Sequence, residues 1–178
     1  MKNLVMAFVI IFMLFFQRVV AQNKVIDYNQ INDIIREYTR CVTEKDSVAF
    51  YALFNEGTVT WCAAIKEASM AKAKEEQGNK KRGTNYFADS YKGFMRGLFH
   101  LTTAKDLFDN IHIVEDGTVA TVTMDYSFWA NGKMTNWGGK YMMLIKRNGS
   151  WKITSVTYSL ELTRFFKQPS LEERQKTT

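Results

Sequence analysis

The stretch that decides the fold is residues 105–162, KDLFDNIHIVEDGTVATVTMDYSFWANGKMTNWGGKYMMLIKRNGSWKITSVTYSLEL. Three Asx-Gly pairs divide it, Asp116-Gly117, Asn131-Gly132 and Asn148-Gly149, and the segments between them are rich in Val, Thr, Tyr, Phe and Trp. An Asx-Gly pair favours the two-residue type I′ turn of a β-hairpin, because both central residues of that turn need positive φ. The pattern predicts four long antiparallel strands joined as a meander. Strands of this length twist, so we expect a curved sheet.

If each turn contains only two residues, the residues that flank it lie opposite one another, and opposed residues share a face. This register predicts an inner face with most of the large apolar side chains: Leu107, Ile111, Ile113, Val122, Met124, Tyr126, Phe128, Trp137, Tyr141, Met143, Val156, Tyr158 and Leu160. The outer face then holds mainly polar side chains: Asn110, His112, Thr121, Thr123, Asp125, Ser127, Asn136, Lys140, Ser155, Thr157 and Ser159.

Four apolar residues break this segregation, because the register puts them on the polar face: Met142, Leu144, Trp151 and Ile153. Either a β-bulge returns them to the core, or they form an outer apolar patch suited to a homodimer interface. The Gly138-Gly139 pair is a candidate bulge or sharp bend. A bulge there would invert the faces predicted for residues 140–146.

The sequence upstream of the meander predicts three helices that can cover the apolar face. Apolar residues recur at helical spacing over about residues 27–43. Asp46 is a good N-cap for a short second helix that ends at Gly57, and residues 58–62 alternate like a strand. A third helix is expected over about residues 85–101. The predicted architecture is α+β: a cone-like, strongly curved antiparallel sheet, made of the four-strand meander and one N-terminal strand, wrapped around three helices.

The first 21 residues have the features of a cleaved signal peptide. Lys2 supplies a positive charge, Leu4 to Phe16 is an unbroken apolar run of 13 residues, and small residues precede Gln22. The run is shorter than the ~20 residues of a transmembrane helix, although an uncleaved anchor is the alternative. We therefore expect an exported protein, periplasmic or secreted, with no stable membrane insertion after cleavage.

The rest of the chain suits one domain with one core. This domain spans residues 22–162, carries a charged insertion at 66–83, and is followed by a polar tail at 163–178. The formal net charge of +6 is mild for a chain of 178 residues. Together with export, it argues against a nucleic-acid partner.

Cys41 and Cys62 are the only cysteines. In an oxidising compartment they form a possible disulfide, which on the chain-entropy model would stabilise the fold by roughly 3 kcal/mol. The alternative is a pair of buried free thiols.

Common catalytic motifs are absent from the sequence. It has no glycine-rich phosphate loop, no CxxC pair and no HExxH motif, and its two histidines, His100 and His112, fall on predicted polar faces. We therefore predict no metal site and no cofactor.

Aromatic residues of the helices and the inner face instead suggest a pocket. The candidate pocket residues are Tyr38, Trp61, Met124, Tyr126, Trp137, Tyr141 and Tyr158. The alternative is that they simply fill the core. Asp109 lies on the inner face opposite Met124 in this register, where burial would raise its pKa and suit a general base. Its place near the end of a strand favours solvent exposure instead.

Several segments resemble the nuclear transport factor 2-like superfamily, which includes the SnoaL-like and ketosteroid isomerase-like proteins. IIREYTRCVTEKDSVAFYALF (residues 34–54) leads into GTVTWC (57–62), and the meander closes with GKMTNWGGKYMMLIKRNGSWKITSVTYSLEL (132–162). The similarity covers about residues 26–162, with 66–83 as additional material. It implies a cone whose curved sheet wraps a long helix. The superfamily contains isomerases, polyketide cyclases, dehydratases, epoxide hydrolases and exported proteins of unassigned role.

The isomerases of this superfamily allow a comparison residue by residue. Tyr38 falls where their oxyanion-hole tyrosine lies, and Cys62 falls at the position of their general-base aspartate. Their second oxyanion donor would fall near Tyr141 or Met142. Only the tyrosine is kept, so no catalytic residue is assigned, and the candidates are Tyr38, Cys62 and Asp109.

The sequence thus favours a non-catalytic, exported protein that binds a small apolar or aromatic ligand between helices and sheet. One alternative is an enzyme of the isomerase, cyclase or dehydratase type that uses Tyr38 with an acid or a thiol of the same pocket. The other is a homodimeric interaction module.

Overall fold

The computed structural model describes residues 27–76 and 84–176, without the side chain of Gln175. The predicted signal peptide and the last seven residues of the charged insertion, 77–83, lie outside the described residues. Among the residues that the structure describes, no helix is long and apolar enough to cross a membrane.

One six-stranded sheet, with the strand order β2-β1-β6-β5-β4-β3, forms the body of the described protein. Its strands are β1 (Thr60–Ile65), β2 (Tyr86–Ala88), β3 (Ala104–Glu115), β4 (Val119–Ala130), β5 (Lys133–Arg147) and β6 (Ser150–Leu162). Strands β3 to β6 are the predicted antiparallel meander. β1 runs parallel to β6 and antiparallel to β2. The fold is α+β as predicted, but the sheet is mixed rather than wholly antiparallel.

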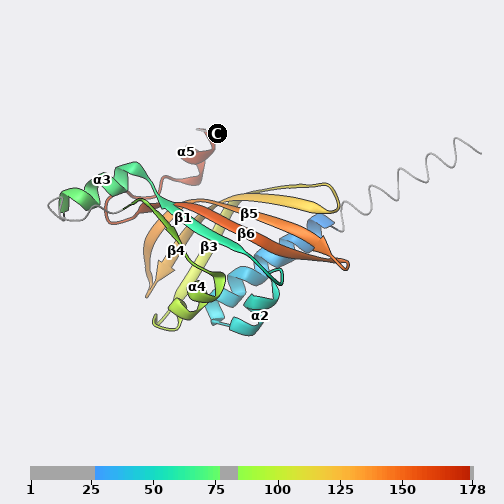
Figure 1. Ribbon diagram of the computed structural model, residues 1–178. Coiled ribbons are helices and arrows are strands. Elements are labelled where there is room, and N and C mark those ends of the chain that lie inside the picture. The colour runs from blue at the N-terminus through green and yellow to red at the C-terminus, as the bar shows by residue number, and fades with distance from the viewer. Residues whose placement is uncertain (1–26, 77–83, 177–178) are drawn as a thin grey trace, which may run out of the picture.

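The helices cover the two faces of the sheet unequally (Figure 1). The long N-terminal helix, described over residues 27–44, lies under the inner face with α2 (Ser47–Ala52) and α4 (Tyr91–Leu98). α3 (Glu67–Glu76) lies beyond one end of the sheet, and α5 (Leu171–Gln175) lies on the outer face. The main core is therefore the layer between the N-terminal helix and the inner face of the meander.

The predicted third helix is shorter than expected, because its first residues form a strand instead. Residues 86–88 are β2, which pairs with β1 at the edge of the sheet. Ser90 then caps α4, with its hydroxyl accepting the Gly93 N–H at 2.9 Å. The serine hydroxyl satisfies a backbone donor that no helical carbonyl can reach, so the helix starts there.

The described part of the charged insertion is a helix that packs against the end of β6. Ser69 of α3 is fully buried, and its hydroxyl donates to Glu161 at 2.6 Å and accepts the Leu162 N–H at 2.8 Å. The charged insertion is thus helical over residues 67–76.

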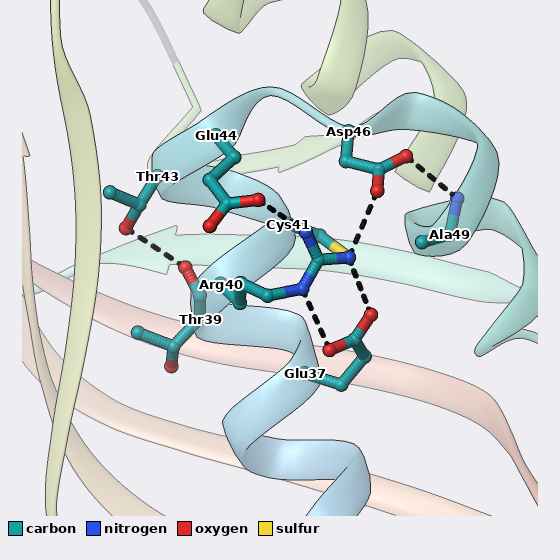
Figure 2. Close-up of polar contacts among 8 residues, drawn as sticks. All are labelled: Glu37, Thr39, Arg40, Cys41, Thr43, Glu44, Asp46 and Ala49. Atoms are coloured by element: carbon teal, nitrogen blue, oxygen red, sulfur yellow. Dashed lines mark hydrogen bonds and ion pairs between the residues drawn. The ribbon is translucent and has the colours of Figure 1, made fainter.

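Arg40 holds the turn between the N-terminal helix and α2 (Figure 2). Its guanidinium contacts Glu37 at 2.6 and 2.8 Å, Asp46 at 2.9 Å, and Glu44. Asp46 is the predicted N-cap of α2 and accepts the Ala49 N–H at 3.0 Å. That backbone N–H, followed by Arg40, lowers the pKa of Asp46. Since these ion pairs are partly exposed, we expect them to orient the turn more than to stabilise the fold.

Two of the three Asx-Gly pairs form the predicted tight turns. The φ angles are 52° and 75° at Asn131-Gly132, and 51° and 78° at Asn148-Gly149, as a type I′ turn requires. Asp116-Gly117 differs, because only its glycine has a positive φ, of 86°. The last cross-strand pair at that end is Glu115 with Ala120, so the loop is two residues longer than predicted.

Each hairpin contains one β-bulge. In β3–β4 the register shifts between Asp109 and His112, where Asn110 has a φ of 49°. In β4–β5 the pairing skips Thr135, and in β5–β6 it skips Thr154. Both threonine hydroxyls donate to a carbonyl of the partner strand, at 3.2 and 3.1 Å. One extra residue in a strand moves every later side chain to the opposite face, so these bulges decide which residues are buried.

The bulges place the predicted outer apolar patch in the core. Its side chains are at most 3% exposed: Met142, Leu144, Trp151 and Ile153. The bulge at Thr135 turns the later part of β5 inward, and β6 follows, because Ile153 pairs with Leu144. The homodimer face predicted on these residues is therefore wrong, and the alternative of a bulge that buries them is confirmed. The Gly138-Gly139 pair is not the site of that bulge.

The same inversion corrects the predicted inner and outer faces. Tyr141 and Met143 lie outside, 53% and 46% exposed, whereas Lys140, predicted outside, is buried. On β3, the bulge after Asp109 leaves Leu107 exposed and buries Asp106. Lys140, which the sequence pattern places outside, and Asp106, which it does not single out, are thus both buried on the inner face of the sheet.

The C-terminal tail crosses the outer face. The Arg174 guanidinium of α5 lies between the carboxylates of Asp109, at 2.8 and 3.0 Å, and Asp125, at 2.6 Å. These two aspartates oppose one another across β3 and β4. The Trp137 indole N–H donates to the Phe166 carbonyl at 2.8 Å. The inner position predicted for Asp109 is therefore wrong, and the exposed alternative is confirmed, with its side chain 44% exposed.

Neighbouring residues of β5 test this register. We expect Leu144→Ala to lower the free energy of unfolding by roughly 2–5 kcal/mol, because it leaves a cavity in the core. Met143→Ala, on the solvent side of the same strand, should change it by no more than about 0.5 kcal/mol. Urea denaturation of both variants measures the difference, and a larger loss for Met143→Ala would contradict the observed faces.

Candidate functional site

A cavity of about 330 Å³ lies between α4, the β1–β2 edge and the inner face of the meander. Six of its fifteen lining residues are aromatic: Trp61, Phe87, Phe94, Tyr126, Phe128 and Tyr158. Phe87, Asp89 and Gly97 line it and are solvent-exposed, so they mark its mouth. Asp106 and Lys140 line it too, and both are buried. The cavity therefore leads from the surface, past aromatic rings, to a charged inner end.

The inner end is an ion pair between Lys140 of β5 and Asp106 of β3. The lysine ammonium donates to Asp106 Oδ2, and the two side chains are 3% and 1% exposed. β4 lies between their strands and contributes Tyr126 to the same place. Removing two charges from water is costly, and a buried pair persists only where each charge keeps its partner.

Aromatic rings surround the ammonium group. Lys140 Nζ lies 4.6 to 5.5 Å from the centroids of four rings: Tyr38, Phe108, Tyr126 and Tyr158. The negative face of an aromatic ring attracts a cation, and this attraction is stronger where water is excluded. The N-terminal helix, β3, β4 and β6 each supply one of these rings. The lysine ammonium therefore contacts side chains of one helix and three strands.

Two polar atoms beside this pair are buried without a hydrogen-bond partner: the Tyr38 hydroxyl oxygen and Asp106 Oδ1. The Tyr38 hydroxyl is near enough to Asp106 to lower the pKa of that carboxyl, but their geometry falls short of a hydrogen bond. A hydroxyl donor and a carboxylate acceptor thus lie side by side at the inner end of the cavity.

Burial shifts the proton affinities of the whole cluster. Desolvation raises the pKa of Asp106 and lowers that of Lys140, and the attraction between the two opposes both shifts. Desolvation also raises the pKa of Tyr38 and Tyr126, and it raises the pKa of Tyr158 to about 12. The tyrosines are therefore neutral hydrogen-bond donors.

The seven predicted pocket residues have three different locations. Trp61, Tyr126 and Tyr158 line the cavity as predicted. Tyr38 and Met124 are buried in the core, with Tyr38 against the ion pair. The other two, Trp137 and Tyr141, lie on the outer face, and the pocket role predicted for them is wrong because of the bulge at Thr135.

The two cysteines are free thiols, so the possible disulfide is not formed; of the alternative pair of buried thiols, only Cys41 is buried. Cys41 faces the core from the N-terminal helix, and burial raises its pKa to about 11. Cys62 lies on the outer face of β1, with its sulfur 3.4 Å from the Thr157 hydroxyl. The sheet separates them. Cys62 is also outside the cavity lining, which removes it as a candidate base in that cavity.

The residues that sequence reasoning missed are Asp106 and Lys140. The sequence pattern predicts an outer position for Lys140 and no role for Asp106. The available signals were Thr135 and Thr154, polar β-branched residues next to breaks in the apolar alternation. Among the described residues, no group of three or more His, Cys, Asp or Glu side chains could hold a metal ion.

No protein-family model matches the sequence, and no curated protein matches it. Solved structures do. A candidate scytalone dehydratase from Novosphingobium aromaticivorans is 14% identical, with a TM-score of 0.60, over 84% of this chain and 94% of its own. A candidate dehydratase of the NTF2-like family from Streptomyces avermitilis is 12% identical, with a TM-score of 0.55, over 78% and 99%.

A third similar structure is an NTF2-like protein of unknown function from Shewanella baltica. It is 17% identical, with a TM-score of 0.53, over 77% of this chain and 95% of its own. The protein therefore has the nuclear transport factor 2-like fold, as the sequence resemblance implied. Identities this low show the fold alone.

The ion pair predicts a characteristic pattern of stabilities. Lys140→Met and Asp106→Val, made singly, should each lower the free energy of unfolding by roughly 3–5 kcal/mol, because each leaves a buried charge without its partner. The double variant should be more stable than either, since it leaves no charge behind. Urea denaturation gives the three values. Additive losses in the double variant would show that the two side chains do not interact.

Proposed function

We propose that this protein binds a small, mostly apolar molecule that carries one polar group, with that group at the Asp106–Lys140 end of the cavity. The observation that carries the proposal is the cavity, with six aromatic residues in its lining, that ends at the buried Asp106–Lys140 ion pair. A site of this kind, apolar with a few convergent polar groups, is typical of small-molecule binding.

The walls and the inner end would contribute differently to binding. Burial of apolar surface against the aromatic rings contributes about 25 cal/mol per Å² and selects for little beyond shape. The Asp106 carboxylate accepts hydrogen bonds only, so it would select a ligand with a hydroxyl or another donor. The cavity volume of about 330 Å³ suits a molecule with a single ring or with two fused rings.

Export remains a proposal that rests on the sequence of residues 1–21. The surface predicted for a homodimer does not exist, because its four side chains are buried in the core: Met142, Leu144, Trp151 and Ile153.

A pair of matched probes tests the binding site. We expect 2-naphthol to bind about 10- to 150-fold more tightly than 2-methylnaphthalene, because its hydroxyl can donate to the Asp106 carboxylate, a bond worth roughly 1.5–3 kcal/mol. Isothermal titration calorimetry compares the two affinities. Equal affinities would contradict the assignment of the polar end.

A variant that blocks the mouth of the cavity supplies a control. Gly97 lines the cavity, and a Cβ there would have no neighbour within 4 Å. Gly97→Phe should therefore abolish 2-naphthol binding, whereas Arg96→Phe, the adjacent exposed position of α4, should leave it unchanged. Unaltered binding to Gly97→Phe would place the ligand elsewhere.

A second candidate function is proton transfer, as in enzymes of the isomerase or dehydratase type. The specific observation is that Asp106 is a cavity-lining carboxyl whose pKa burial raises, with the Tyr38 hydroxyl beside it. A base of this kind is suited to take a proton from a carbon next to a carbonyl. Two of the similar structures carry names of candidate dehydratases, which agrees with this candidate without assigning it.

Deuterium exchange tests the second candidate with a simple ketone. In D2O the protein should accelerate deuterium incorporation at the acidic C–H positions of 2-tetralone, and Asp106→Asn should reduce the rate at least 100-fold. Asp125→Asn, on the outer face of the same sheet, is the matched control and should exchange like the unaltered protein. Exchange by Asp106→Asn at the unaltered rate would exclude Asp106 as the base.

A further inference from the structure

We propose that Lys140 is an amine nucleophile that forms an imine with small apolar aldehydes or ketones in the cavity, with Asp106 as its proton acceptor and donor. This inference rests on the proposed function, because the same cavity must admit the carbonyl compound. It goes further by naming the substrate class and a covalent bond.

The placement of Lys140 is the first argument. Among the described residues that line the cavity it is the only amine, and it lies at the inner end rather than at the mouth. The wall on either side is aromatic. An apolar carbonyl compound that fills the cavity therefore meets one amine nucleophile, whose side chain is buried.

The second argument concerns the proton on the amine. Only a neutral amine attacks a carbonyl, and an exposed lysine is almost wholly protonated at neutral pH. Desolvation lowers the pKa of Lys140 and raises that of Asp106, whose Oδ2 accepts from the ammonium. Transfer of one proton along that hydrogen bond converts the ion pair into a neutral amine and a neutral carboxylic acid.

The product of the reaction keeps the charges of the resting site. A protonated imine is a cation at the position of the ammonium, so the carboxylate of Asp106 and the four surrounding rings can stabilise it in the same way. The rings that stabilise the ammonium in the resting site thus also stabilise the protonated imine.

The atoms and protons balance over the sequence. Asp106 takes a proton from Lys140, and the amine forms a C–N bond to the carbonyl carbon, while its second proton moves to the carbonyl oxygen. The Asp106 acid then protonates the resulting hydroxyl, the C–O bond breaks, and water leaves. A protonated imine and an Asp106 carboxylate remain, and no oxidant or reductant is needed. Hydrolysis reverses the sequence, so the capture is reversible.

Reductive trapping tests the inference on the unaltered protein. The protein is incubated with 2-naphthaldehyde and sodium cyanoborohydride at pH 6, where ordinary lysines are almost fully protonated because their pKa is about 10.4. We expect one naphthylmethyl group per chain, located at Lys140 by peptide mass spectrometry. Excess 2-naphthol, which occupies the same cavity, should reduce the labelling at least 10-fold.

Two variants control for chance labelling and for misfolding. Lys105→Met removes an exposed lysine of β3 and should be labelled like the unaltered protein. The double variant Asp106→Val/Lys140→Met, in which neither charge is left unpaired, should lose the label while keeping the circular dichroism spectrum of the unaltered protein.

The possible outcomes separate this inference from the proposed function. Labelling spread over exposed lysines, absent from Lys140 and insensitive to 2-naphthol, would overturn the imine. If 2-naphthol still binds in that case, reversible binding in the cavity stands and only the covalent step is lost. If neither 2-naphthol nor 2-naphthaldehyde binds, both proposals fail.

Discussion

Successive side chains of a β-strand point to opposite faces, and the position of each bulge therefore decides the content of both faces. The three hairpins of this sheet each contain one such irregularity, at Asn110, Thr135 and Thr154. Without the bulge at Thr135, Lys140 would face solvent and Met142 would leave the core. Without the bulge after Asp109, Asp106 would likewise face solvent. The ion pair, its aromatic surroundings and the cavity that ends there all depend on these local shifts.

The buried ion pair between Lys140 and Asp106 lies at the wall of a cavity. A pair of this kind is a weak source of stability, because desolvation of both charges offsets most of their attraction. Replacing it with apolar side chains would preserve the layers of the fold, so packing alone does not explain its presence. Its position at the inner end of an aromatic cavity suggests selection for chemistry or recognition instead.

Much of the fold was predictable from the sequence. Asx-Gly pairs located the hairpins, helical spacing located the N-terminal helix, and Asp46 located the start of α2. These features follow from local preferences of a few residues. The β2 strand was not predictable in this way, because a three-residue edge strand has too short a pattern and depends on its pairing with β1.

The candidate site was predicted less well than the fold, for a definite reason. Trp61, Tyr126 and Tyr158 were placed correctly, since large aromatic residues of an inner face line any cavity that is present. Asp106 and Lys140 were not, because a register error of one residue exchanges inside and outside. Thr135 and Thr154 satisfy a carbonyl of the partner strand through their side chains, and that tertiary interaction leaves only a faint trace in a single sequence.

The contact of Arg174 with Asp109 and Asp125 has a practical consequence for work on this protein. Two carboxylates that face each other across neighbouring strands repel, and here a guanidinium from the last helix lies between them. Trimming of the tail by a protease, or an affinity tag that pulls α5 away, would expose that pair of like charges on β3 and β4. The choice of where to attach a purification handle is thus also a choice about the electrostatics of the sheet.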